Sequence, residues 1–228
     1  MTGRAEETMK RHFSEELAGL HEKVMRMGGL AEQMTRRSVQ ALVERKGDLL
    51  GEVRAMETQV NQLHIDIDEA CLEIIALRQP AAKDLRFIAA AMKINTDLER
   101  IGDQAINIVQ RAESLLSVPL LKPLIDIPRM AEIAEEMLKE SLDAFVNGDA
   151  DLAYANILKD DSVDQLKDQV FRELLTYMMA DPKTIPTAMD LILVSRHLER
   201  VADHATNICE DVIFMVKGKD VRHKGPLA

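Results

Sequence analysis

An eleven-residue block occurs twice in this 228-residue chain, with the two copies 100 residues apart. LERIGDQAINI spans 98–108, LERVADHATNI spans 198–208, and seven of the eleven positions are identical. Further upstream, ETQVNQL (57–63) resembles DDSVDQL (160–166) at an offset of 103. Similarity at so long a period indicates a duplicated unit of several secondary-structure elements. We therefore expect two halves of similar fold.

The apolar residues follow a helical period. They recur alternately every three and four positions over 13–41, 53–77 and 94–108, which is typical of helices that pack along one another at a shallow angle. Aromatic residues make up only 3% of the chain and alternating runs of β-branched residues are scarce, so we predict no strand.

Proline and glycine positions divide the chain into six helical segments. Pro80 and the Gly-Asp pairs at 47–48 and 148–149 mark short connections, which make neighbouring helices run antiparallel. We predict an all-α fold of six helices, in two tandem, internally repeated three-helix up-down bundles. The predicted domains are a first bundle over 1–118, a proline-rich linker over 119–128 and a second bundle over 129–228. Whether a twofold axis or a translation relates the two bundles is open at this point.

The charge balance limits the class of partner. The chain has 29 Lys and Arg residues against 39 Asp and Glu residues, a formal net charge of −10, and this argues against non-specific nucleic-acid binding. Two cysteines support neither a disulfide framework nor a thiolate metal site. No apolar stretch is long enough to span a membrane. We expect a cytoplasmic protein, and leave open a peripheral position at the inner face of the membrane through partners.

The repeated block also keeps polar residues that a helix core does not need. Glu99 and Asp103 are four positions apart, so they share one helix face, turned away from the apolar stripe. Glu199 and Asp203 repeat this pair in the second half. Carboxylates at this spacing repel one another, and a cation with oxygen ligands would remove the repulsion.

We predict a surface metal site in each half, holding iron or another divalent ion such as Zn, Mn or Mg. The predicted ligands are Glu57, Asn61, Glu99 and Asp103 in the first half, and Asp160, Asp164, Glu199 and Asp203 in the second. Asn61 carries no charge, which weakens the first site. The alternative is a solvated acidic face, because 30% of the chain is charged.

Other polar residues of the block have simpler interpretations. His197 and His204 have no histidine counterpart in the first half, so we expect both to be exposed structural residues. Arg100 and Arg200 do repeat. Bidentate geometry would let them dock an anion or an acidic partner, whereas the simpler interpretation, which we favour, is an ion pair within each helix.

Enzyme motifs are absent. The chain has no phosphate-binding loop, no nucleophile elbow and no HExxH, and no histidine has a glutamate three residues before it, as ferritin-like di-iron proteins require. We predict a protein that is not an enzyme and has no catalytic residues. The alternatives are a non-catalytic helical scaffold and a carboxylate-bridged metal enzyme.

Two stretches resemble the PhoU family of phosphate-signalling proteins. They are RQPAAKDLRFIAAAMKINTDLERIGDQAINI (78–108) and SRHLERVADHATNICEDVIF (195–214). The resemblance implies two similar three-helix bundles and an E(D)xxxD signature that holds surface metal clusters. That signature corresponds to Glu99 with Asp103, Glu199 with Asp203 and Asp160 with Asp164, whereas the fourth copy reads Glu57 with Asn61 and departs from it.

The resemblance also implies a function. PhoU-like proteins act as negative regulators of phosphate uptake and of the phosphate-starvation response. They are thought to link the ATPase of the phosphate ABC transporter to a membrane sensor histidine kinase, and they are commonly homodimers. By this resemblance we expect a cytoplasmic adaptor with these partners and with metal clusters on its surface.

Overall fold

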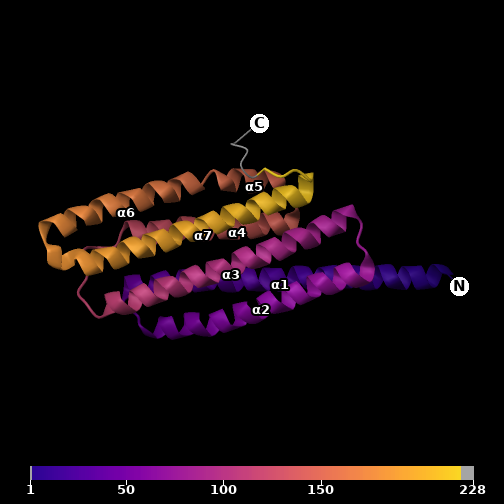
Figure 1. The fold of residues 1–228 in the computed structure, drawn as a ribbon, viewed down its shortest axis with the longest axis horizontal. Coiled ribbons are helices and arrows are strands. Elements are labelled where there is room, and N and C mark those ends of the chain that lie inside the picture. Colours follow the sequence, from indigo (N-terminus) through magenta and orange to yellow (C-terminus); the bar gives the residue numbers. More distant parts are fainter. Residues whose placement is uncertain (1, 222–228) are drawn as a thin grey trace.

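The computed structural model describes residues 2–221, with side chains from residue 12 onward. Over these residues the chain is helical and contains no strand, as predicted. The six predicted segments are present, the fifth as a short and a long helix in succession (Figure 1). The helices are α1 (Thr2–Glu44), α2 (Asp48–Arg78), α3 (Ala82–Leu116), α4 (Asp126–Asn147), α5 (Ala150–Ile157), α6 (Asp160–Ala180) and α7 (Ile185–Lys217), with a 3-10 turn at Pro182–Thr184 before α7.

Residues with left-handed backbone end several helices. Gly148 follows α4 with φ of 61° and Gln79 follows α2 with φ of 47°; glycine adopts this conformation without steric cost, and other residues do not. Arg45 has φ of 56° directly after α1, and its guanidinium donates a 2.7 Å hydrogen bond to the carbonyl of Leu116. The end of α1 thereby caps the end of α3.

The break between α5 and α6 follows from a difference in spacing between the two halves. Twelve residues separate Gly148 from Asp160, whereas ten separate Gly47 from Glu57. On a continuous helix, two extra residues would rotate Asp160 and Asp164 about the helix axis by about 200° relative to the equivalent residues of α2. The turn at Leu158 and Lys159 absorbs the extra residues, so α6 begins at Asp160 with its acidic pair in the same register as the pair on α2.

The two halves are related by a pseudo-twofold axis, which passes between α3 and α7. These two helices pack antiparallel across the middle of the molecule (Figure 1). His204 Nδ1 lies 2.8 Å from Asp97 Oδ1, and His197 Nδ1 lies 2.9 Å from Gln104 Oε1. At the offset of 100, each of these contacts is the twofold equivalent of the other. The choice between an axis and a translation is therefore decided by the structure.

These two contacts correct the expectation that His197 and His204 are exposed. Both imidazoles are part-buried, and the side chain of His204 is 17% exposed. Burial, with the positive charges of Arg200, Arg111 and Arg196, lowers the pKa of His197 to about 4, so this imidazole is neutral near pH 7. Asp97 is the counterpart of His197 and the partner of His204, and Gln104 is the counterpart of His204 and the partner of His197. A search for repeated residue types does not detect such an exchange.

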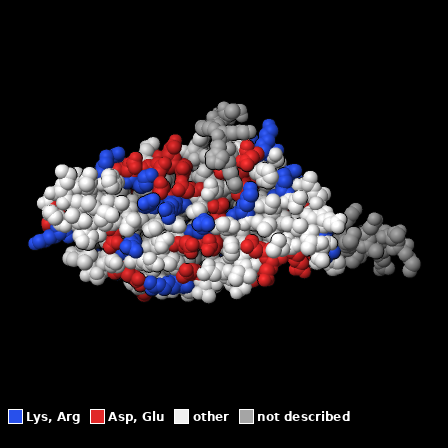
Figure 2. Space-filling view, in the orientation of Figure 1, with Lys and Arg blue, Asp and Glu red and all other residues white. Residues whose placement is uncertain are grey.

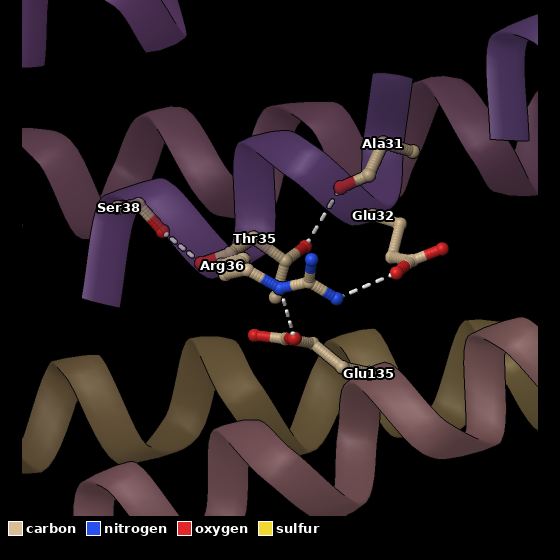
Figure 3. Close-up of polar contacts among 6 residues, drawn as sticks. All are labelled: Ala31, Glu32, Thr35, Arg36, Ser38 and Glu135. Carbon is tan, nitrogen blue, oxygen red and sulfur yellow. Dashed lines mark hydrogen bonds and ion pairs between the residues drawn. The ribbon is translucent and has the colours of Figure 1, made fainter. Parts of the chain in front are cut away.

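The helices α1 and α4 form the second contact between the halves. At an offset of 103 they share buried positions, since Met27 and Met34 correspond to Met130 and Met137. Arg36 on α1 donates hydrogen bonds to Glu32 on its own helix (2.7 Å) and to Glu135 on α4 (2.9 Å), as Figure 3 shows. Glu32 and Glu135 are themselves equivalent positions of the repeat. Four helices, α1, α3, α4 and α7, thus form the centre, and α2 and α6 lie at opposite edges (Figure 1).

One hydrophobic core runs through both halves. Buried residues of α1, α3, α4 and α7 belong to a single cluster, in which Ile101 and its counterpart Val201 are both fully buried. The helix α4 begins at Asp126, inside the predicted linker. Pro128 does not prevent this, because it lies in the first turn of α4, where proline is tolerated. The predicted domain limits at residues 1 and 228 lie outside the described residues, and the division into two domains stays a prediction.

Candidate functional site

The predicted ligands of the second half lie on α6 and α7, which pack side by side at one edge of the molecule. Lys167 joins the two helices, since its Nζ donates to Asp164 Oδ1 at 2.8 Å and to Glu199 Oε1 at 2.9 Å. Asp160 and Glu199 are half-buried, whereas Asp164 and Asp203 are exposed. We call these four acidic residues the second acidic set.

The electrostatics show that the second acidic set shares one neighbourhood. Burial and then, in decreasing order, the charges of Asp203, Asp164, Asp161 and Glu199 together raise the pKa of Asp160 to about 6. The pKa of Asp203 is raised too, first because the neighbouring helices partly desolvate this exposed carboxylate, and then by the charges of Glu199 and Asp164. The pKa of Lys167 is raised by its hydrogen bonds to Asp164 and Glu199. The structure therefore gathers these carboxylates, with one ammonium group to offset their charge.

The first acidic set, made of Glu57, Asn61, Glu99 and Asp103, lies in the equivalent place on α2 and α3. Its exposure repeats that of the second set, with Glu57 and Glu99 half-buried and Asn61 and Asp103 exposed. No hydrogen bond or ion pair with another described residue involves these four side chains. The sequence pattern predicted both sets, and the structure links only the second by a shared cation.

Lys167 is the residue that the sequence analysis missed. At the offset of 103 its counterpart is His64, so the lysine is not part of the repeat. The imidazole of His64 lies 3.7 Å from Asp68 on its own helix. The backbone carbonyl of His64, not its imidazole, accepts a hydrogen bond from Asn95 on α3. The sequence contains one indication of this contact. Lys167 is three residues after Asp164, on the helix face that carries the acidic pair.

The chemistry of the second acidic set fits a divalent cation. Carboxylate oxygens are the ligands that Mg²⁺ and Mn²⁺ prefer, and like charges crowded enough to raise each other's pKa are stabilised by a cation. In the described part of the chain, however, no three His, Cys, Asp or Glu side chains already converge to the spacing of a metal site. Metal ligation by these residues stays a prediction.

Arg100 and Arg200 do not form the ion pairs predicted within their helices. Among the described residues neither guanidinium has an ion-pair partner, although Glu99 and Asp103 lie close along the helix to Arg100. Both arginines are exposed and line a cavity of about 480 Å³ between α3 and α7, which is open to solvent. Because the two arginines are related by the pseudo-twofold axis, both lie at the interface between α3 and α7. The simpler interpretation, an ion pair within each helix, is therefore wrong.

Known proteins are similar to this chain over both halves. The model of the PhoU family, described as "PhoU domain", matches residues 24–112 and 127–212. The chain is 40% identical over 218 residues to the "Phosphate-specific transport system accessory protein PhoU homolog" of Pseudomonas aeruginosa, covering 95% of this chain and 90% of the relative.

Solved structures agree with the fold. The crystal structure of PhoU from Pseudomonas aeruginosa has a TM-score of 0.88 at 40% identity and covers 91% of this chain and 100% of its own. The structure of the phosphate transport system regulatory protein PhoU from Streptococcus pneumoniae has a TM-score of 0.83 at 27% identity, and covers 92% of this chain and 99% of its own.

Proposed function

This chain belongs to the PhoU family, and on that premise we propose that it is an accessory protein of a phosphate-specific transport system and a negative regulator of phosphate uptake. Its relatives are named accessory and regulatory proteins, which supports a role without catalysis. The observation that carries the proposal is the family match across both halves of the chain, together with an acidic set at the equivalent place in each half.

The regulator would act as an adaptor between two membrane-associated partners. We propose the ATPase of the phosphate ABC transporter and a sensor histidine kinase, and we propose that the protein works from the cytoplasm as a homodimer. In the part of the chain that the structure describes, no helix has an apolar stretch long enough to cross a bilayer.

The outer helices offer a surface for such partners. Large apolar side chains are exposed on α2 and α6, including Leu72 and Leu77 on the first and Phe171 and Met179 on the second. Exposed apolar side chains along one helix are a common feature of protein-docking surfaces. We propose that these two helices, which lie at opposite edges of the molecule, contact the transporter ATPase and the kinase.

The acidic sets would hold metal ions beside these helices. Iron or another divalent ion such as Zn, Mn or Mg would be bound by Asp160, Asp164, Glu199 and Asp203 in the second half. Glu57, Asn61, Glu99 and Asp103 would form the weaker site of the first half. A bound cation would neutralise the crowded carboxylates and fix α6 against α7. In that role it would set the shape of the docking surface.

The adaptor role is tested by affinity capture of the tagged protein from cells grown in high and in low phosphate. We expect the transporter ATPase and a sensor kinase to be recovered in amounts that depend on phosphate. Replacing Phe171 and Met179 by aspartate should abolish one of these contacts, and replacing Leu72 and Leu77 the other. If neither partner appears under either condition, the adaptor proposal is wrong.

The metal role is tested separately, with Glu199→Ala combined with Asp203→Ala. We expect this variant to lose bound divalent metal, measured by elemental analysis of the purified protein, and to lose repression of a phosphate-regulated promoter. The matched control is Asp151→Ala with Asp143→Ala, which removes two exposed carboxylates outside both acidic sets. Normal repression by a variant that has lost the metal of the second half would eliminate the role of that metal site and leave the adaptor role standing.

A further inference from the structure

The cavity between α3 and α7 is built from residues of both halves and lies beside the pseudo-twofold axis. Its volume is about 480 Å³. Arg100 and Gln104 line it from α3, and Arg200, His204 and Asn207 line it from α7. Figure 2 shows basic side chains in the middle of the face where α3 and α7 lie in front, with acidic groups above and below. The lining is polar, which fits a small charged ligand rather than an apolar one.

Two exposed guanidinium groups line the same cavity and favour an anion there. Arg100 and Arg200 both line it, and among the described residues neither has an ion-pair partner. His197 contacts Gln104 of the cavity lining, and its pKa is lowered first by burial and then by the charges of Arg200, Arg111 and Arg196. A guanidinium presents a planar fork of donors that matches an oxyanion with two hydrogen bonds.

The other polar side chains of the cavity are held in place or lack a partner. His204 Nδ1 and Asn207 Nδ2 lie 2.8 and 3.2 Å from the same oxygen of Asp97, which fixes the orientation of both side chains. Thr206 lines the cavity, and its hydroxyl oxygen is buried with no hydrogen-bond partner among the described residues. A buried hydroxyl without a partner costs free energy that a bound ligand would recover.

We propose that this cavity binds a small tetrahedral oxyanion that carries a hydrogen, and that inorganic phosphate is this ligand. Arg100 and Arg200 neutralise its charge, and Thr206 donates a hydrogen bond to it. Asp203, which also lines the cavity, accepts a hydrogen bond from the protonated oxygen of hydrogen phosphate. A carboxylate is an acceptor only, so it repels sulfate, which carries no hydrogen near neutral pH.

This site goes beyond the proposed function, because an adaptor needs no small-molecule ligand of its own. The two sides of the axis also differ at the position of Thr206, so only one side offers a hydroxyl group to the ligand. The counterpart of Thr206 is Ile106, which has no hydroxyl to donate. We therefore expect one anion for each chain rather than two.

The test is equilibrium dialysis of the full chain against labelled inorganic phosphate, with a chelator present so that phosphate held by a metal is not counted. We expect saturable binding of one phosphate per chain, weak or no competition by sulfate, and weaker binding by at least about tenfold in Arg100→Ala and in Arg200→Ala. Asp203→Asn should reduce the preference for phosphate over sulfate. Arg172→Ala is the matched control, because Arg172 is an exposed arginine on α6 that does not line the cavity.

Three outcomes would overturn the proposal. One is no binding at about 10 mM phosphate, well above a Kd of about 1 mM. Another is sulfate binding as tight as phosphate binding. The third is a phosphoserine peptide that binds more tightly than free phosphate, since the ligand would then be a phosphoryl group on a partner protein. Circular dichroism of each variant confirms its helix content, and Thr206→Val, which keeps the side-chain shape, provides a second variant that should weaken binding.

Discussion

Lys167 holds the position in the second acidic set that the predicted metal ion would take. Its ammonium group bonds to one carboxylate on α6 and one on α7, as a bridging cation would. A metal ion that binds Asp164 and Glu199 has to displace it. The metal affinity of this site therefore depends on how much more strongly the carboxylates bind the metal ion than they bind the ammonium group.

The first prediction follows from this competition. Lys167→Ala removes the competing ammonium group, so we expect the affinity for Mn²⁺ to rise by about tenfold or more. Titration calorimetry measures this directly. The control is Lys217→Ala, whose ammonium pairs with Asp151 outside the acidic sets. An unchanged or lower affinity in Lys167→Ala would mean that the metal ion and the ammonium group of Lys167 do not compete for the same oxygens.

The second prediction concerns the two thiols. Burial raises the pKa of both Cys71 and Cys209 to about 12, so on the order of one in ten thousand would be thiolate at pH 8. We expect neither thiol to react with iodoacetamide within hours in the native protein, and both to react within minutes in denaturant. Mass spectrometry of intact chains measures the labelling. Rapid labelling of the native protein would contradict the buried position of these cysteines.

At the scale of the elements, the close contact of α1 with α4 depends on a glycine. A Cβ atom placed on Gly28 would lie 2.6 Å from Leu142 Cδ1, whereas a Cβ on the neighbouring Gly29 meets no atom within 4 Å. Leu142 is itself buried, so it has little room to move. Two adjacent glycines in the same helix thus have different roles, because only one of them faces the other half of the molecule.

The third prediction compares these two glycines. Alanine is a better helix former than glycine by up to about 1 kcal/mol, so Gly29→Ala should raise the free energy of unfolding by about that amount. The free energy of unfolding of Gly28→Ala should be at least about 1 kcal/mol lower than that of Gly29→Ala, because Leu142 must move to make room for the added methyl group. Urea unfolding followed by circular dichroism measures both. Equal stability of the two variants would show that α1 and α4 are less closely packed than described.

At the scale of the whole molecule, the two halves share one core rather than meeting as separate bodies. The apolar faces of α3 and α7 are buried against each other, as are those of α1 and α4. Ion pairs close both ends of the interface between α3 and α7, through Arg111 with Asp190 and Lys93 with Asp211. Separating the halves would expose this apolar surface to water.

The fourth prediction is that the two halves unfold together. The only two tyrosines, Tyr154 and Tyr177, lie in the second half, and the chain has no tryptophan. Tyrosine fluorescence therefore reports on the second half alone, and far-ultraviolet circular dichroism reports on the helices of both. We expect the two signals to give the same urea midpoint. A helical signal that persists after the tyrosine transition would show that the halves are independent domains.

The sequence by itself determined the helical class, the duplication and the acidic residues. Helical periodicity and proline positions depend on local geometry, so they can be read from one stretch of chain at a time. The repeat marked Glu99, Asp103 and their counterparts because polar residues outside a core are not needed for packing. The family resemblance, now confirmed, came from the same residues.

Only the tertiary structure decided how the halves face each other and which charges share a site. A twofold axis and a translation leave the same repeat in the sequence. The axis placed His204 against Asp97 and brought Arg100 and Arg200 to one cavity, although no local spacing relates the members of either pair. Lys167 was missed for the same reason, since it is absent from the repeat. Contacts between distant segments are set by how the buried faces of α3 and α7 meet, and such packing is a property of the folded chain.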